Sequence, residues 1–272
     1  MKLRGGIVVI ISIFFTKSFA TGDLTITGGR SASMGYTSVA TADAWSGFNN
    51  QAGLSWSRKF IVGIYLENKF LIKEISLKAI GAVMPIKRGT WGLSFSHFGY
   101  SQYNEIKAGL AYSMLFGKKF SAGLQFDYLR MKQGADYGSR NIVTFEIGFQ
   151  FRITGRLNLG VHIYNPFPVK VFETGKETLP VIFRLGFAWQ LSNSVLGSVE
   201  FEKDLIMKPI YKAGLEYHFV KPVYFRFGFL TNPSQFTFGL GVELGKFNFD
   251  LASSYHPVLG YSPQASLIYF FN

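Results

Sequence analysis

The stretch NIVTFEIGFQFRI, residues 141–153, changes character at almost every step. Phe145, Ile147 and Phe149 are apolar, whereas Thr144 and Glu146 beside them are polar. Successive side chains of a β-strand point to opposite faces, so this period predicts a strand with one apolar and one polar face. Two environments fit such a strand: a half-solvated sheet of a soluble sandwich and the wall of a membrane barrel.

The composition favours the membrane. Of 272 residues, 48% are hydrophobic, 17% are aromatic and only 16% are charged, and the chain has 29 Phe. A soluble sandwich would have to hide most of these rings, whereas a lipid-facing surface can expose them. Beyond the first twenty residues, no apolar run approaches the roughly 18 residues that a spanning helix needs. The sequence therefore predicts strands rather than helices in the membrane.

The alternation recurs after residue 58 in about fourteen segments of roughly ten residues, the length of a tilted membrane-crossing strand. They start near Phe60, Ile75, Trp91, Tyr103, Phe120, Asn141, Leu157, Val181, Val195, Ile210, Val223, Gln235, Phe247 and Gln264. Short turns, such as residues 116–118 and 245–246, alternate with longer loops at 131–140, 165–180, 203–208 and 256–263. This pattern predicts an all-β, closed antiparallel transmembrane barrel with its short turns in the periplasm.

The first twenty residues, MKLRGGIVVIISIFFTKSFA, predict a secretory signal peptide: Lys2 and Arg4 precede an apolar core that ends in small residues. The mature chain should begin near Thr21. The chain has no Cys, which excludes a lipid-modified cysteine and disulfides. The formal charge of +12 indicates a membrane-proximal basic surface rather than a nucleic-acid partner, because the chain is exported. We expect it in the outer membrane of a Gram-negative bacterium.

The polar rows should line the lumen, and they carry charges of both signs. They include Lys107, Asp127, Glu146, Arg184, Glu200, Glu216, Arg226, Glu243 and Asp250. The positions of the short turns predict that Glu216 lies opposite Arg226 and that Lys107 lies opposite Asp127. Two interpretations stay open: a structural lining of ion pairs, or a selectivity surface for a polar solute.

Nothing in the sequence predicts catalysis. Ser254 and His256 share a strand face, but a Ser two residues from a His is common by chance. No phosphate-binding loop, metal-ligand cluster or paired-carboxylate site stands out. We therefore expect a non-enzymatic protein without cofactor or metal.

Residues 29–56 break the alternation, being rich in Gly, Ser and Ala. The sequence thus divides into a signal peptide (1–20), a plug or hatch that fills the barrel (21–57) and the barrel itself (58–272). The plug contains Met34-Gly35, then Ala42-Asp43, then the motif Asn49, Asn50, Gln51, Ala52, Gly53 and Leu54. This segment resembles the start of FadL-type outer-membrane barrels, and more closely of their PorV/PorQ branch in Bacteroidota. That family has Pro where this chain has Gln51. The aromatic carboxy-terminal strand is also similar to that of outer-membrane barrels.

The resemblance implies two roles. FadL-type barrels pass hydrophobic compounds through an amino-terminal hatch and a lateral opening. PorV/PorQ relatives are accessory partners in type IX secretion. The longest expected loop, residues 165–180, is short and charged, which leaves little room to capture a ligand. The sequence therefore favours an accessory barrel that contacts membrane lipid and other outer-membrane or periplasmic proteins, with transport of a hydrophobic small molecule as the alternative.

Overall fold

The computed structural model describes residues 26–134, 138–170 and 178–271. Its strands are β1 (Ile61–Asn68), β2 (Ser76–Ile86), β3 (Gly89–Gly99), β4 (Tyr103–Phe116), β5 (Phe120–Gln133), β6 (Ser139–Arg152), β7 (Leu157–Tyr164), β8 (Ile182–Ser192), β9 (Val195–Asp204), β10 (Ile210–Val220), β11 (Val223–Leu230), β12 (Gln235–Leu244), β13 (Phe247–His256) and β14 (Gly260–Phe270). Its helices are all short: α1 (Gly29–Ser33), α2 (Ser46–Asn49), η1 (Gln51–Trp56), η2 (Lys69–Leu71) and η3 (Lys73–Ile75). In these ranges we find no helix with the length and apolarity that a membrane crossing requires. The proposed signal peptide and the start of the mature chain lie outside the described residues.

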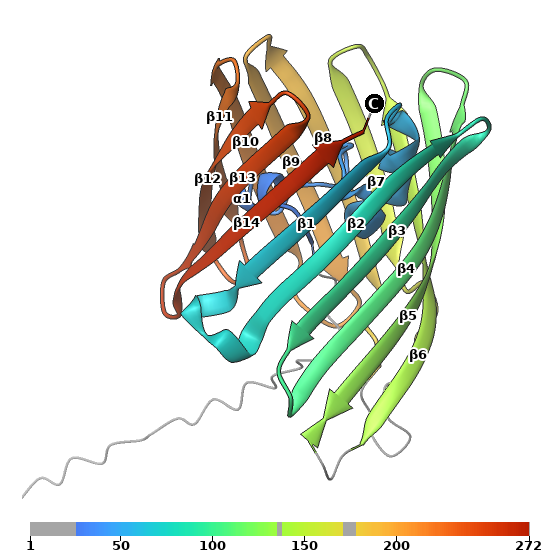
Figure 1. The fold of residues 1–272 in the computed structure, drawn as a ribbon, viewed down its shortest axis with the longest axis vertical. Helices are drawn as coiled ribbons and strands as arrows, with labels where there is room; N and C mark the ends of the chain where they lie inside the picture. The colour runs from blue at the N-terminus through green and yellow to red at the C-terminus, as the bar shows by residue number, and fades with distance from the viewer. Residues whose placement is uncertain (1–25, 135–137, 171–177, 272) are drawn as a thin grey trace, which may run out of the picture.

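The strands form one closed antiparallel barrel in chain order (Figure 1). β1 completes the circle by pairing with β14, where Gly63 lies opposite Ile268. The backbone N–H of Phe271 also donates to the carbonyl of Phe60 at 2.9 Å. Closure gives every described strand a neighbour on both sides, as a membrane-spanning sheet requires. The predicted fold class and its fourteen strands are confirmed.

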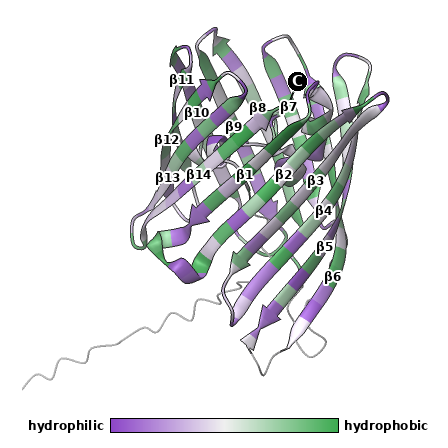
Figure 2. Cartoon of the chain, viewed as in Figure 1, coloured by the Kyte–Doolittle hydropathy of each residue, from purple (hydrophilic) through white to green (hydrophobic). Residues whose placement is uncertain are grey.

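The two faces of the wall are chemically distinct, and Figure 2 shows apolar and polar residues alternating along the strands. Within residues 141–153, Val143 is 68% exposed on the outside of the barrel, whereas Glu146 is fully buried inside it. Phe126 and Asp127 on β5 repeat this contrast, with 60% and 1% exposure. The alternation therefore reports the two sides of a barrel wall, as predicted.

The barrel has two different ends. The turns β2–β3, β4–β5, β6–β7, β8–β9, β10–β11 and β12–β13 gather at one end, which we call the short-turn end. The remaining loops gather at the opposite, long-loop end, although several of them are also brief. The loop between β13 and β14, expected at residues 256–263, is confined to residues 257–259. The loop is shorter than expected because β14 already includes Pro263, which lies opposite Ser253. The fixed φ of proline is compatible with an extended strand at this position.

One predicted register is confirmed and one is wrong. Glu216 lies opposite Arg226, as expected. Lys107, however, lies opposite Leu129, and Asp127 lies opposite Gly109. The β4–β5 turn is centred on Lys118 rather than Gly117, which shifts the pairing by two residues. Lys107 still reaches Asp127 diagonally, with 3.5 Å between Nζ and Oδ2.

Candidate functional site

Residues 26–57, which we call the lumenal segment, lie inside the barrel (Figure 1). The indole of Trp45 is fully buried and packs edge-on against Tyr65 of β1, with ring centroids 5.9 Å apart. Phe48 and Leu54 join the same apolar cluster, which includes Val83 of β2. The segment is therefore packed against one side of the wall as a protein core is.

Buried charges hold the segment against the opposite side. Glu200 of β9 accepts hydrogen bonds through Oε2 from the backbone N–H groups of Ser38 and Val39, at 2.9 and 3.0 Å. Its Oε1 accepts from the Arg184 guanidinium at 2.8 Å and from Lys212 Nζ at 3.1 Å. Both oxygens of the Glu200 carboxylate thus accept hydrogen bonds, which offsets the free-energy cost of burying its charge.

Arg184 of β8 extends the same cluster into the segment. Its Nη1 donates to the carbonyl of Asn49 at 2.8 Å, and its Nη2 donates to Ser38 Oγ at 2.7 Å. The side chain is fully buried. One planar guanidinium therefore links a barrel carboxylate to two separate turns of the lumenal segment.

A second cluster surrounds Glu146 of β6. Its carboxylate contacts Lys107 of β4, accepts from Gln51 of the segment at 2.6 Å, and lies 2.8 Å from His162 Nε2. Asp127 completes the cluster through Lys107. Four neighbouring strands and the segment meet at this point.

A third cluster surrounds Glu216 of β10. Arg30 of the segment donates to both carboxylate oxygens, at 2.7 and 2.8 Å, and Arg226 donates to one of them at 2.6 Å. Arg226 also donates to Asp250 at 2.7 Å, and Asp250 accepts from Ser266. The nearby Glu216 carboxylate raises the pKa of Arg30, so this residue stays charged across the physiological pH range.

Amide side chains bind the segment's backbone directly. Asn50 donates to the carbonyls of Val39, Phe149 and Val161, at 2.7, 3.2 and 3.2 Å. Gln150 of β6 donates to the carbonyl of Val39 at 3.0 Å and to that of Thr41 at 2.8 Å. These side-chain amides thus satisfy the buried carbonyls of Val39 and Thr41 and add to the backbone hydrogen bonds within the segment's own short helices.

Glycines in the wall make this approach possible, because they lie opposite one another on neighbouring strands beneath the segment. The pairs are Gly63 with Gly81, Gly123 with Gly148, Gly160 with Gly186, and Gly214 with Gly228. A Cβ on Gly160 would lie 2.0 Å from the carbonyl oxygen of Val39, and one on Gly228 would lie 1.9 Å from the Gly35 nitrogen. Only a wall without side chains here can touch the segment's backbone.

The structure brings together nearly all of the charges predicted to line the lumen. Lys107, Asp127, Glu146, Arg184, Glu200, Glu216, Arg226 and Asp250 all form ion pairs inside the barrel. Glu243 is separate, since it lies exposed at the short-turn end beside Asn248. The motif residues Asn49 to Leu54 are buried, and Asn49, Asn50 and Gln51 make the contacts given above. Because the charges pair with one another and with the segment, their geometry favours the structural interpretation over a selectivity surface.

Ser254 and His256 do not form a catalytic pair. Ser254 Oγ lies near Gln264 and Tyr36, at 3.4 Å from each. His256 Nδ1 accepts from the backbone N–H groups of Val258 and Leu259. The described parts of the chain also hold no group of His, Cys, Asp and Glu side chains suited to a metal ion.

A pocket of about 220 Å³ opens beside the segment at the long-loop end. Its lining combines Tyr36 and the apolar residues Ile26, Phe70, Ile210 and Leu230 with the charged residues Glu67, Lys69, Glu202 and Lys212. The Tyr36 hydroxyl accepts from Gln264 at 3.0 Å. The sequence did not predict this pocket, because the residues that line it come from the segment and from the ends of several strands. The alternation of side chains along a strand shows which face each residue occupies, but not which residues of different strands come together.

Apolar residues also cap several loops at this end. They are Leu71 and Ile72 between β1 and β2, Leu205, Ile206 and Met207 between β9 and β10, and Val258 and Leu259 between β13 and β14. The backbone N–H of Phe70 donates to Ser262 Oγ at 2.9 Å, which joins the first of these loops to the start of β14. We call these exposed loop residues the apolar rim. The rim was not predicted, because only the length and charge of the loops were used to interpret them.

Comparison with known proteins identifies the fold. Family models and curated sequences give no match. The Ralstonia pickettii toluene transporter TbuX is similar, with a TM-score of 0.70 and 12% identity over 92% of this chain and 100% of that chain. A Pseudomonas aeruginosa FadL homologue has a TM-score of 0.68 and 11% identity, covering 90% and 98%. The fold is that of a FadL-type barrel. The Pseudomonas putida toluene transporter TodX has the same fold, with a TM-score of 0.65 and 12% identity over 92% of this chain and 98% of TodX.

In this FadL-type barrel the strand pairing is complete near the short-turn end but not along the whole of β6. Strands β1 to β6 pair with one another without a register shift among the residues described. β6 and β7, however, pair only from Glu146 opposite Tyr164 to Arg152 opposite Asn158, so residues 139–145 of β6 have no partner on β7. Shifts occur between Gln190 and Ser192 and between His218 and Val220, both beside short turns.

Proposed function

We propose that this FadL-type barrel lies in the outer membrane of a Gram-negative bacterium and admits a small hydrophobic molecule. The observation that carries the proposal is the pocket of about 220 Å³ beside the lumenal segment, where four apolar side chains lie together among polar and charged ones. It is smaller than the roughly 300–1,000 Å³ typical of sites for drug-sized ligands. The apolar rim lies at the same end, and the similar structures named above include two toluene transporters.

The lumenal segment would be the barrier in the path. A second cavity, of about 410 Å³, lies at the short-turn end, where Arg30, Asp43 and Glu243 line it. Tyr36 lines the first pocket and Arg30 the second, so residues 30–36 separate the two. Passage would require this part of the segment to shift, while the Arg184 and Glu146 clusters hold the rest in place.

An accessory role of the PorV/PorQ kind is the second candidate. It is favoured by the filled lumen, because a docking subunit needs no path through its interior. Type IX secretion, a Bacteroidota source and protein partners belong to this candidate alone. Neither candidate involves catalysis.

Pocket filling tests the transport proposal. Ile210→Trp would occupy the pocket, whereas Ile153→Trp places the same ring on the exposed β6–β7 turn at the other end of the barrel as a matched control. The measurements are binding of toluene to the purified barrel and uptake of labelled toluene by cells that carry it. We expect Ile210→Trp to reduce both at least fivefold and Ile153→Trp to leave both unchanged.

Equal behaviour of the two variants would contradict the pocket assignment. Recovery of the barrel in a stable complex with other outer-membrane proteins after gentle extraction, with no toluene binding by the wild type, would support the accessory role instead.

A further inference from the structure

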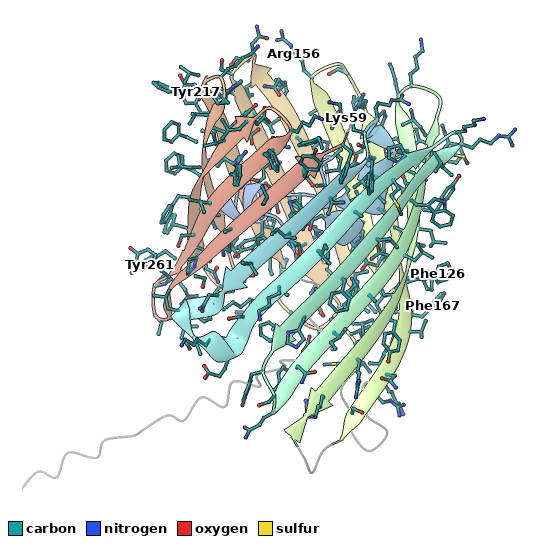
Figure 3. The ribbon with its side chains drawn as sticks, in the orientation of Figure 1. Lys59, Phe126, Arg156, Phe167, Tyr217 and Tyr261 are labelled. Carbon is teal, nitrogen blue, oxygen red and sulfur yellow. The ribbon has the colours of Figure 1, made fainter. Side chains whose placement is uncertain are left out.

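The short-turn end carries a set of exposed basic side chains, which we call the basic ring. It consists of Arg58, Lys59, Lys87, Arg88, Lys118, Lys119, Arg152, Arg156, Lys221 and Lys246. These residues occupy every short turn except that between β8 and β9, together with the residues that enter β1. Figure 3 shows Lys59 and Arg156 at this end of the barrel. The ring therefore extends around most of the circumference rather than forming one patch.

The basic ring lacks acidic partners. In the described ranges, none of its side chains forms an ion pair with a carboxylate, in contrast to the fully paired cations of the lumen. Glu243 is the only acid in the short turns or the strand residues next to them. Arg152 packs instead over the ring of Trp56, with its guanidinium carbon 3.6 Å from the ring centroid. Unpaired cations at such density attract an anionic surface.

Exposed apolar side chains lie directly next to these cations along the strands. Ile86, Phe116, Phe151, Ile153, Val220 and Leu244 are all on the outer surface at this end. Along each strand, the surface changes from apolar to cationic over two or three residues. A phospholipid monolayer has the complementary order, since its phosphates lie just beyond its acyl chains.

One groove at this end combines both features. It has a volume of about 460 Å³, and its lining includes the cationic residues Arg58, Lys87 and Arg88 and the apolar residues Ile86, Met114 and Leu115. Inorganic phosphate would contact only the cationic residues. A molecule with both an anionic head and an apolar chain would contact both kinds.

We propose that the basic ring, and this groove above all, binds the phosphate groups of anionic phospholipids in the adjacent leaflet. An acidic protein is the less suitable partner, because it would cover one side of the barrel while the cations surround it. The inference rests on the proposed membrane location, with the short turns in the periplasm. It does not depend on the transported molecule.

The test uses the full mature barrel in an uncharged detergent. Its affinity for phosphatidylglycerol is measured by native mass spectrometry and by the shift in thermal unfolding midpoint, against phosphatidylcholine with identical acyl chains. Each cation near an anionic surface strengthens binding roughly fivefold. The combined substitutions Arg58→Gln, Lys87→Gln and Arg88→Gln should therefore weaken phosphatidylglycerol binding about a hundredfold and leave phosphatidylcholine binding unchanged.

A matched control removes the same charge from the long-loop end through Lys73→Gln, Lys132→Gln and Lys208→Gln, all at exposed positions. We expect its affinity to stay within about twofold of wild type. If the first variant fails to fold, Lys118→Gln with Lys119→Gln tests the same ring at another turn, with an expected loss of about twenty-five-fold.

Four results would overturn the inference: equal binding of the two lipids, equal losses in the ring and control variants, displacement of the lipid by equimolar inorganic phosphate, or its displacement by equimolar polyglutamate. The third would indicate a simple anion site and the fourth a surface for an acidic protein. A barrel that prefers phosphatidylglycerol but binds no toluene would contradict only the proposed function, whereas the reverse would contradict only this inference.

Discussion

Gln51 of the lumenal segment donates a 2.6 Å hydrogen bond to the carboxylate of Glu146 on the barrel wall. The outer-membrane barrels whose amino-terminal motif this segment resembles have Pro at this position, and a Pro side chain could not donate this hydrogen bond. The departure from the family motif therefore coincides with a buried contact between the segment and the wall. Glu146 also pairs with Lys107, so the bond belongs to a network rather than standing alone.

Gln51→Ala should destabilise the barrel by about 1–3 kcal/mol, since it removes a charge-assisted hydrogen bond to a buried carboxylate. The measurement is the free energy of unfolding in detergent or lipid vesicles. Gln102→Ala, at an exposed loop position, is the matched control and should change stability by less than about 0.5 kcal/mol. An unchanged stability for Gln51→Ala would mean that the bond contributes nothing net.

Arg184→Met should cost about 3–5 kcal/mol, because it leaves Glu200 buried with only part of its charge compensated. The loss should appear as a lower unfolding midpoint and as faster proteolysis within residues 26–57, which Arg184 contacts through Asn49 and Ser38. Arg156→Met, at an exposed turn, serves as the control. Equal effects of the two substitutions would contradict an anchoring role for Arg184.

Gly160→Ala should displace the lumenal segment, because the new methyl group would lie 2.0 Å from the carbonyl oxygen of Val39 and backbone cannot rotate away. Overpacking of this kind typically costs about 1–3 kcal/mol. Gly155→Ala, where a Cβ meets nothing within 4 Å, is the matched control. Hydrogen exchange at Val39 and Ala40 should increase in the first variant and not in the second.

Phe126→Arg should destabilise the membrane-inserted barrel by about 2–4 kcal/mol, since it places a charge on the lipid face at mid-strand. Val258→Arg introduces the same charge at a loop tip that is 84% exposed, and should cost under about 1 kcal/mol. Urea unfolding from lipid vesicles measures both. Similar costs would argue against lipid contact for the Phe126 face.

The alternation of side chains was sufficient to predict the barrel, because a period of two gives both the strand and the chemistry of its two faces. It also placed Glu216 opposite Arg226. It misplaced Lys107 by two residues, since a turn's centre is not determined by the alternation of the strands it joins. Pro263 was assigned to a loop, although an extended strand tolerates it.

The interior was harder to predict, because its contacts join residues far apart in the chain. Arg184 and Asn49 are such a pair, and so are Gly160 and Val39. The glycines on the polar face were visible in the sequence, but their purpose depends on the register that places them in pairs. The pocket at Ile210 and Leu230 likewise exists only once the strand ends converge on residues 26–36.

The pairing of β1 with β14 has a consequence for biogenesis. Gly63 finds its partner Ile268 only when the last strand has been synthesised. Pairing across such a sequence separation is slow, and exposed apolar surface aggregates in the meantime. In the proposed outer-membrane location, the chain would cross an aqueous compartment with its rows of Phe unprotected, so it should need a holding chaperone until the barrel closes.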